Sequence, residues 1–291
     1  MGSRIAERPV SQIRPGDHAA FSFTTAEEQA QVIGPFLHDG LDARHKVIYI
    51  SGGGPRQLPG LAGRCDADRL AGTGQLRVIP RGAACLTRGR FDPDRMLMVI
   101  GREISLAAEQ GYAAVRLTAD MSWVLGQPGG YPLMLASEAG FDAAITPGAE
   151  IMAICQLDRA RCAPEHLSAL NDTHRIRVTP NPEFDDGVLR ITRTHTPVGL
   201  RLSGELDAAR HPPFVAALTA LGEANTDIHL DFTDVRFLDL ATLTLLVTHA
   251  LRTQPGHGLV LDHLPPDVVR LIESLGWRQF PGLANGRPRH P

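Results

Sequence analysis

The loop from Ser22 to Glu28, between an apolar run and a helical pattern, is the first place to look for nucleotide chemistry. A phosphate-binding loop has the spacing GxxxxGK[ST], in which backbone N–H groups cradle the phosphates and the lysine neutralises their charge. This loop has no glycine and no lysine, and it carries two acidic residues. The glycine-rich segment Ser51 to Pro55 also lacks a lysine, and Lys46 precedes that strand. We therefore expect no ATP hydrolysis, whereas nucleotide binding without hydrolysis stays open.

The sequence contains no standard zinc-binding or hydrolase motif. Cys155, Asp158, Cys162 and His174 are of metal-ligating types, but their spacing fits no standard zinc pattern. Neither GxSxG nor HExxH occurs. The sequence therefore predicts no catalytic residue, no metal site and no cofactor.

Four side chains are predicted to line one ligand pocket, namely His18, Asp120, Trp123 and Glu138. Asp120 and Trp123 follow an expected strand, Ala113 to Thr118, and open α/β sheets bind ligands at the carboxyl ends of their strands. His18 follows a turn at the start of another strand. The alternative is that Trp123 anchors the core and His18 is a hydrogen-bonded turn residue.

Strand and helix patterns alternate through residues 10–175, which favours a parallel sheet covered by helices on both faces. The expected strands are His18 to Phe23, Lys46 to Ile50, Leu76 to Pro80, Ala113 to Thr118 and Glu150 to Leu157. The expected helices are Ala26 to Leu41, Leu58 to Ala71, Asp94 to Gln110, Leu133 to Phe141 and Pro164 to Leu170.

A segment rich in proline and acidic residues, 176–186, is predicted to link this domain to a second one at 187–280. The second domain has the expected order ββαβαβα. Its strands are Val188 to Arg193, Val198 to Ser203, Asp227 to Phe232 and Gly258 to Leu261, and its helices are Pro212 to Gly222, Ala241 to Leu251 and Asp267 to Leu275. The fold class is therefore α/β in both domains.

Composition narrows the class of protein. The net charge of -3 and the lack of a basic run argue against a nucleic-acid partner. No stretch approaches the ~20 apolar residues that cross a membrane. The N-terminal residues lack the apolar region of a signal peptide, so reduced cysteines and a cytoplasmic location are expected.

The second domain contains two motif-like segments. Residues 198–207 read VGLRLSGELD, and residues 229–239 read HLDFTDVRFLD. They resemble the STAS family, in which a strand ends in GELD and a later strand, D[LF][ST]xVxF[LIM]D, leads into a helix. The match covers about residues 187–280. It implies a small mixed sheet backed by helices and a role in binding protein partners.

In STAS antagonists the loop before that helix docks on an anti-sigma kinase, and a serine there is phosphorylated. The motif puts this position on Ala241, so the resemblance implies that the phosphorylation switch is lost. Asp239 is expected to be a helix N-cap, and Thr242 and Thr244 carry the nearest hydroxyls. The implied docking surface comprises Asp207, Asp239, Leu240, Ala241 and Thr242.

The first domain resembles the MEDS sensory domain, a RecA-like relative with a degraded nucleotide site. The segments that carry the resemblance are PGDH at 15–18, GRFDP at 89–93, RLTADMSW at 116–123 and CQLD at 155–158, together with Glu138 and His174. The resemblance implies sensing of small organic molecules.

Together these features suggest a non-catalytic regulator of the anti-sigma-factor-antagonist type, in which ligand sensing is coupled to a STAS domain. The expected partner is an anti-sigma factor or another histidine-kinase-like protein. Two alternatives stay open: a residual nucleotide-binding or nucleotide-hydrolysing RecA-like protein, and a scaffold subunit of a signalling assembly.

Overall fold

The computed structural model describes residues 5–54, 57–61, 67–145, 150–221, 226–251, 257–276 and 282–289. The chain divides into two compact units, Met1–Asn181 and Pro182–Pro291. Within the described ranges, no helix is both long enough and apolar enough to cross a membrane.

The first unit is built on a seven-stranded parallel sheet with the order β1-β9-β2-β8-β7-β3-β4. Its strands are β1 (Ala6–Pro9), β2 (His18–Phe23), β3 (Lys46–Ser51), β4 (Leu76–Pro80), β7 (Val115–Asp120), β8 (Ile151–Asp158) and β9 (Ile176–Thr179). The short strands β5 (Leu86–Thr87) and β6 (Arg90–Phe91) form a separate antiparallel pair. Its helices are α1 (Ala26–Asp42), α2 (Ala67–Gly72), α3 (Arg81–Ala84), α4 (Pro93–Glu109), α5 (Ser122–Leu125), α6 (Gly130–Ala144) and α7 (Pro164–Asp172).

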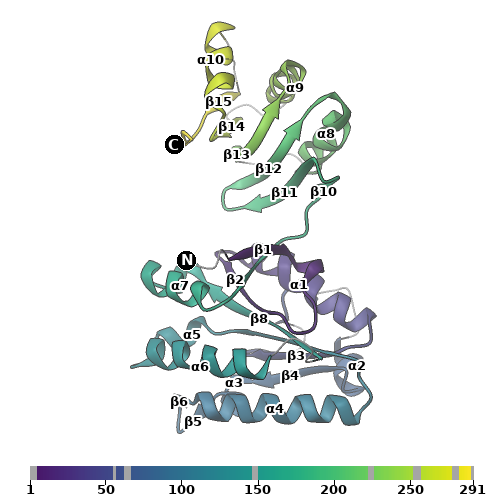
Figure 1. The fold of residues 1–291 in the computed structure, drawn as a ribbon, viewed down its shortest axis with the longest axis vertical. Coiled ribbons are helices and arrows are strands. Elements are labelled where there is room, and N and C mark those ends of the chain that lie inside the picture. Colours follow the sequence, from purple (N-terminus) through teal and green to yellow (C-terminus); the bar gives the residue numbers. More distant parts are fainter. Residues whose placement is uncertain are drawn as a thin grey trace. The chain divides into compact units, whose positions relative to one another are not determined.

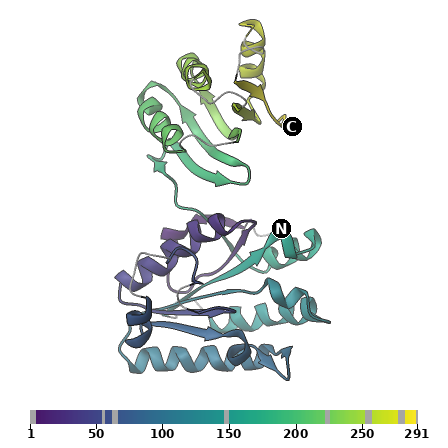
Figure 2. The same cartoon turned by 180° about the vertical axis from the view of Figure 1, so that it is seen from behind.

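Helices cover both faces of this sheet (Figures 1 and 2). Successive strand side chains point to opposite faces, and β3 shows the result: Val47 and Tyr49 belong to one buried cluster, Ile48 and Ile50 to the other. Helix α1 completes the first cluster, whereas α4 and α6 complete the second. The apolar runs in the sequence are therefore strands buried on both sides, as a parallel sheet requires.

The second unit has a mixed six-stranded sheet with the order β10-β11-β12-β13-β14-β15. Its strands are β10 (Phe184–Asp185), β11 (Leu189–His195), β12 (Val198–Leu206), β13 (Ile228–Leu238), β14 (Leu259–Asp262) and β15 (Leu283–Asn285). The pairs among the first three are antiparallel, and the remaining pairs are parallel. Helices α8 (His211–Ala220), α9 (Leu240–Ala250) and α10 (Pro266–Ser274) bury Phe214, Leu246 and Ile272 in the core of this unit.

The observed architecture confirms the expected α/β fold class in both units. The segment predicted as a linker, 176–186, differs from the expectation because it contributes β9 to the first sheet and β10 to the second. Strands β1 and β15 were not expected. Of the helix expected from Leu58 to Ala71, the structure has α2 from Ala67; residues 62–66 lie outside the described ranges, as does residue 280, the predicted end of the second domain.

Candidate functional site

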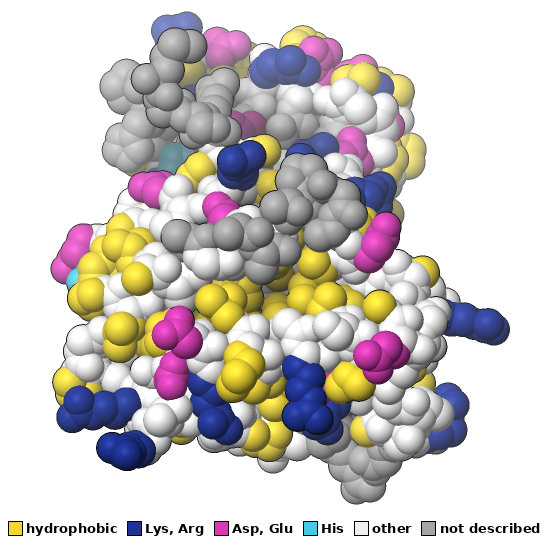
Figure 3. All heavy atoms as spheres, turned by 60° about the horizontal axis from the view of Figure 1, so that its bottom comes forward, with side chains coloured by type: hydrophobic (Ala, Val, Ile, Leu, Met, Phe, Trp, Pro, Cys, Tyr) yellow, Lys and Arg dark blue, Asp and Glu magenta, His cyan; other side chains and the backbone are white. Residues whose placement is uncertain are grey.

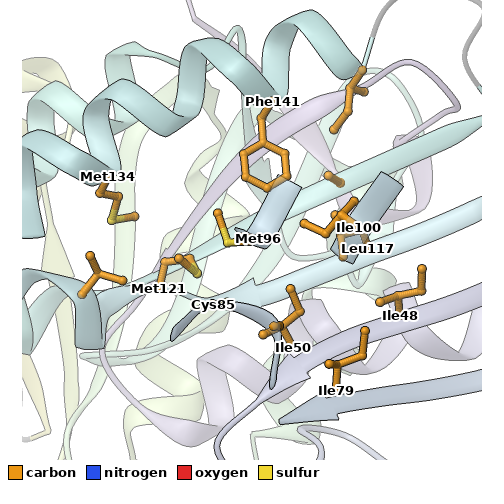
Figure 4. Close-up of a cluster of buried hydrophobic side chains, with 14 of the residues drawn as sticks. Ile48, Ile50, Ile79, Cys85, Met96, Ile100, Leu117, Met121, Met134 and Phe141 are labelled. Atoms are coloured by element: carbon orange, nitrogen blue, oxygen red, sulfur yellow. The ribbon is translucent and has the colours of Figure 1, made fainter. Parts of the chain in front are cut away.

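An apolar cavity lies between the sheet of the first unit and helices α4 and α6. Its volume is about 20 Å³, which is room for roughly one water-sized group. Figure 4 shows Phe141 of α6 together with Met96, Ile100 and Leu117, which are among its lining residues. Ser137, Glu138 and Cys155 also line the cavity and add polar groups to its mainly apolar wall.

Four side chains converge beside this cavity from four separate parts of the fold. His18 begins β2, Glu138 lies in α6, Cys155 lies in β8, and His174 lies between α7 and β9. His18 Nε2 lies 3.2 Å from Cys155 Sγ and 3.4 Å from Glu138 Oε2. His174 Nε2 lies 3.3 Å from the same Glu138 oxygen. We call His18, Glu138, Cys155 and His174 the four-residue cluster.

The two imidazole rings of the cluster are oriented by hydrogen bonds at their other nitrogens. His18 Nδ1 donates to Asp142 Oδ1 at 2.9 Å, and His174 Nδ1 donates to the carbonyl oxygen of Leu170 at 2.9 Å. The roles follow because a carboxylate and a carbonyl only accept. Both Nε2 atoms therefore face the cluster with a lone pair rather than a proton.

Burial disfavours charge on these groups. It raises the pKa of Glu138 to about 8, with help from the nearby Asp142 carboxylate. It lowers the pKa of His174 to about 4, with a smaller contribution from His18, and it lowers the pKa of His18 despite the hydrogen bond to Asp142. Burial also raises the pKa of the Cys155 thiol. These pKa shifts favour the uncharged forms of all four side chains, so the cluster is neutral near pH 7.

The structure brings together two of the four residues predicted to line one pocket. His18 and Glu138 meet in the cluster, but Asp120 is in register with Gln156 of β8, three residues beyond Ala153, which pairs with His18. At ~3.3 Å per residue this is roughly 10 Å along the sheet. The prediction placed His18 and Asp120 at the same edge of the sheet. In the structure His18 begins β2 and Asp120 ends β7, so they lie toward opposite ends of the parallel strands.

Asp120 and Trp123 have structural partners where they are. The Asp120 carboxylate accepts hydrogen bonds from the backbone N–H and the hydroxyl of Ser122 at 3.0 and 2.7 Å. Trp123 packs edge-on against Phe91 and lies under the Arg81 guanidinium. These contacts organise the short helix α5.

Of the four residues of metal-ligating type noted in the sequence, two lie in the cluster and two do not. Cys155 and His174 belong to the cluster. Asp158 instead caps the short helix Arg159–Arg161 by accepting from the N–H of Ala160 at 2.9 Å. Cys162 is buried among apolar side chains.

The start of α1, where a phosphate loop would lie, is occupied by the chain's own carboxylate. Glu28 accepts a hydrogen bond from the backbone N–H of Thr24 at 2.7 Å and pairs with Arg159 at 2.7 Å. Thr25 caps the helix by accepting from the N–H of Glu28. An anion already bonds the N–H group of this loop that a phosphate would need, which agrees with the missing glycine and lysine.

In the second unit, the start of α9 is held by a polar network. Asp239 is the N-cap, as expected, and its carboxylate accepts from the backbone N–H and the hydroxyl of Thr242 at 2.7 Å each. His211 Nε2 lies 3.1 Å from the same carboxylate. Burial alone would raise the pKa of Asp239, but these hydrogen bonds lower it.

This network leaves apolar side chains exposed beside it. Phe237 is 50% exposed, Leu240 is 55% exposed, and Ala241 is also exposed. Thr242 is completely buried, and Thr244 is exposed two positions further along. We call Phe237, Leu240 and Ala241 the α9-start surface. Phe237 was not among the residues predicted for docking, although it lies in the motif that suggested the surface.

Asp207, the remaining residue predicted for docking, has a local role. It precedes the short helix Ala208–Arg210, and both its oxygens accept from Arg210 Nη1, at 2.8 and 2.9 Å. Arg210 also pairs with Asp186 at 2.9 Å. Asp207 therefore helps fix the turn that leads from β12 to α8.

The fold is that of a two-domain α/β protein, in which a parallel sheet covered by helices precedes a mixed sheet backed by helices. Family models match both domains. Residues 17–175 match the family described as MEDS, methanogen/methylotroph, DcmR sensory domain, and residues 189–283 match the family described as Mlab, STAS domain. The first match covers more than half of the chain, so the chain belongs to the MEDS family. Both resemblances seen in the sequence are confirmed.

Among solved structures, the chain is similar to two archaeal proteins. A KaiC-like protein from Pyrococcus horikoshii OT3 has 10% identity and a TM-score of 0.41. The flagellar accessory protein FlaH from Methanocaldococcus jannaschii has 12% identity and a TM-score of 0.37. Each alignment covers 62% of this chain and 78% of the other. No curated protein matches the chain.

Proposed function

We propose that this chain is a non-catalytic signalling regulator of the anti-sigma-factor-antagonist type. Its MEDS domain senses a small organic ligand, and its STAS domain docks through the α9-start surface on a histidine-kinase-like anti-sigma factor. The proposal is supported most by the exposed pair Phe237 and Leu240 beside Ala241, because apolar groups raised at a rigid helix start suit a protein partner.

The same surface supports docking that phosphorylation does not switch off. Ala241 has no hydroxyl, and the hydroxyl of Thr242 is buried and bonded to Asp239. Control then comes from ligand binding in the MEDS domain, which requires that the ligand bind two states of the chain with different affinities.

Affinity capture tests the partner class. The full chain is immobilised, and bound proteins from a bacterial lysate are identified by mass spectrometry for the wild type, Leu240→Arg and Leu251→Arg. Leu251 is 59% exposed and follows the opposite end of α9, so it is a matched control. We expect a histidine-kinase-like protein with the wild type and Leu251→Arg, but not with Leu240→Arg.

Three results would count against the proposal. Capture of other signalling subunits without any kinase-like protein would favour the scaffold alternative. Equal capture by Leu240→Arg and Leu251→Arg would show that docking uses another surface. Turnover of ATP by the isolated chain would contradict the non-catalytic assignment and the closed α1 loop at Glu28.

A further inference from the structure

We propose that the four-residue cluster of the MEDS domain is a zinc site, with His18 Nε2, His174 Nε2, Cys155 Sγ and one oxygen of Glu138 as the ligands. These atoms all lie within 4.8 Å of one another. The inference does not depend on which partner the STAS domain binds.

The distances match those of a tetrahedral ion. Zinc bonds of about 2.0–2.3 Å place neighbouring ligand atoms roughly 3.3–3.8 Å apart. Three of the six separations between the ligand atoms are 3.2, 3.3 and 3.4 Å, and all six are within 4.8 Å. A tetrahedral ion therefore matches three of the pairs directly and requires the more distant ligand atoms to move closer by up to about 1 Å.

Two buried atoms of the cluster lack any other partner. Glu138 Oε2 and His174 Nε2 are both buried, and neither has a hydrogen bond in the structure. Buried polar atoms are nearly always paired with protein, water or an ion. A bound cation would satisfy both atoms at once and would also engage His18 Nε2 and Cys155 Sγ, which otherwise hydrogen-bond to each other at 3.2 Å.

The surroundings of the ligands support metal binding. Histidines that bind metals usually donate their second ring N–H to a carboxylate or a backbone carbonyl, which fixes the ring and leaves the other nitrogen as the ligand. His18 does so with Asp142, and His174 does so with Leu170. Both rings are thus oriented before any ion arrives.

The ligand types identify the metal class. Two imidazoles, one thiol sulfur and one carboxylate form a mixed set of borderline and soft donors, which suits Zn²⁺ and excludes Mg²⁺ and Ca²⁺, whose ligands are oxygens. Glu138 and Cys155 also line the apolar cavity, so the ion would sit at its polar end. A bound ion would then hold Glu138 and Cys155 in place at this end of the cavity.

Metal titration tests the site directly. The full chain, without an affinity tag, is stripped with a chelator and titrated with Zn²⁺ against a chromophoric competitor, and then with Co²⁺ as a spectroscopic substitute. We expect one tight Zn²⁺ per chain, together with tetrahedral cobalt bands and a thiolate-to-cobalt charge-transfer band.

Matched variants separate the ligands from other cysteines and histidines. Cys155→Ser removes the charge-transfer band, whereas Cys162→Ser, at another buried free cysteine of the same unit, retains it. His174→Ala abolishes tight binding, whereas His38→Ala, at a buried histidine bonded to Gly60, does not. Asp142→Ala weakens Zn²⁺ binding by about 10- to 100-fold because it removes only the support of His18.

Melting temperatures measured with and without Zn²⁺ distinguish loss of the metal site from misfolding of a variant. Zn²⁺ that binds the folded chain raises its melting temperature by mass action, so the wild type and Cys162→Ser gain thermal stability with Zn²⁺ and Cys155→Ser does not. Absence of a tight Zn²⁺ or Co²⁺ site in the wild type would overturn the proposal. A charge-transfer band that persists in Cys155→Ser would also overturn it. Neither result would change partner capture by the STAS domain, so the two proposals can fail separately.

Discussion

The carboxylate of Asp239 lies 2.7 Å from both the backbone nitrogen and the hydroxyl oxygen of Thr242. One side chain thus closes the first turn of α9 and engages the hydroxyl nearest to the position where STAS antagonists are phosphorylated. Because Thr242 is completely buried, what the first turn presents to a partner is Leu240 and Ala241.

Replacing Asp239 by alanine is expected to destabilise the second unit by about 1 kcal/mol, since the N-cap hydrogen bond is lost. Chemical denaturation followed by circular dichroism measures the change. Asp234→Ala, at an exposed aspartate of β13, is the control and should leave the free energy of unfolding nearly unchanged. Equal stabilities of Asp239→Ala and the wild type would show that the network does not hold the turn.

Introducing serine at position 241 should restore a phosphorylation site. Incubated with ATP and its kinase-like partner, Ala241→Ser is expected to gain one phosphate, and its affinity should fall because about -1.5 to -2 charges appear on an apolar surface. Mass spectrometry of the intact chain checks this, with the wild type as the unmodified control. Phosphate on wild-type Thr244, which is exposed, would mean that the switch has moved rather than disappeared.

Gly204, in the GELD motif, is predicted to be irreplaceable for structural reasons. Its φ is +103°, and a Cβ there would lie 1.9 Å from the carbonyl oxygen of Val188. Gly204→Ala should cost about 1–3 kcal/mol from backbone strain alone, and more from the clash. Calorimetry should show a lower melting temperature for the second unit only, whereas Gly187→Ala, which also has positive φ but open space, should cost less.

Asp262 is expected to give the second unit an acid-sensitive step. Burial alone would raise its pKa, but hydrogen bonds from the Arg287 side chain and backbone and from His229 lower it from 3.8 to about 2. Because the folded-state pKa is depressed, the contribution to stability is complete above about pH 4 and is lost as the pH falls toward 2.

Denaturation at several pH values tests this assignment. Asp262→Asn should lower the free energy of unfolding at pH 7 by about 1–2 kcal/mol, reduced from the full linkage value by solvent screening. It should also flatten the pH dependence between about pH 4 and 2 relative to the wild type. An unchanged slope would assign the acid transition to other carboxylates.

Much of the fold could be predicted because its long strands and helices have strong patterns. The expected strand from His18 to Phe23 coincides with β2, and the expected helix from Ala26 to Leu41 nearly coincides with α1. Strand β1 was missed because Ala6–Pro9 is short, charged and ends in proline, as an edge strand does. Strand β9 was assigned to the linker because its four residues, although they alternate apolar and polar, directly precede the prolines and acidic residues of the domain boundary.

The site was harder to predict because its residues come from distant segments. The α9-start surface followed from a contiguous motif around Asp239. The four-residue cluster has no local spacing, because His18, Glu138, Cys155 and His174 meet only through the order of the parallel strands and the packing of α6. The signal available was that all four residues lie in the segments that resemble MEDS domains.

On the face in Figure 3, apolar, basic and acidic side chains are intermixed, so this face shows no large surface of one charge sign. The central claim of the proposed function is that the start of α9 binds the partner. Isothermal titration of the captured kinase-like protein with purified wild type, Leu240→Arg and Leu251→Arg tests it. We expect Leu240→Arg to lose at least ~30-fold in affinity, about 2 kcal/mol, and Leu251→Arg to bind like the wild type. Equal affinities for all three chains would contradict docking at the start of α9.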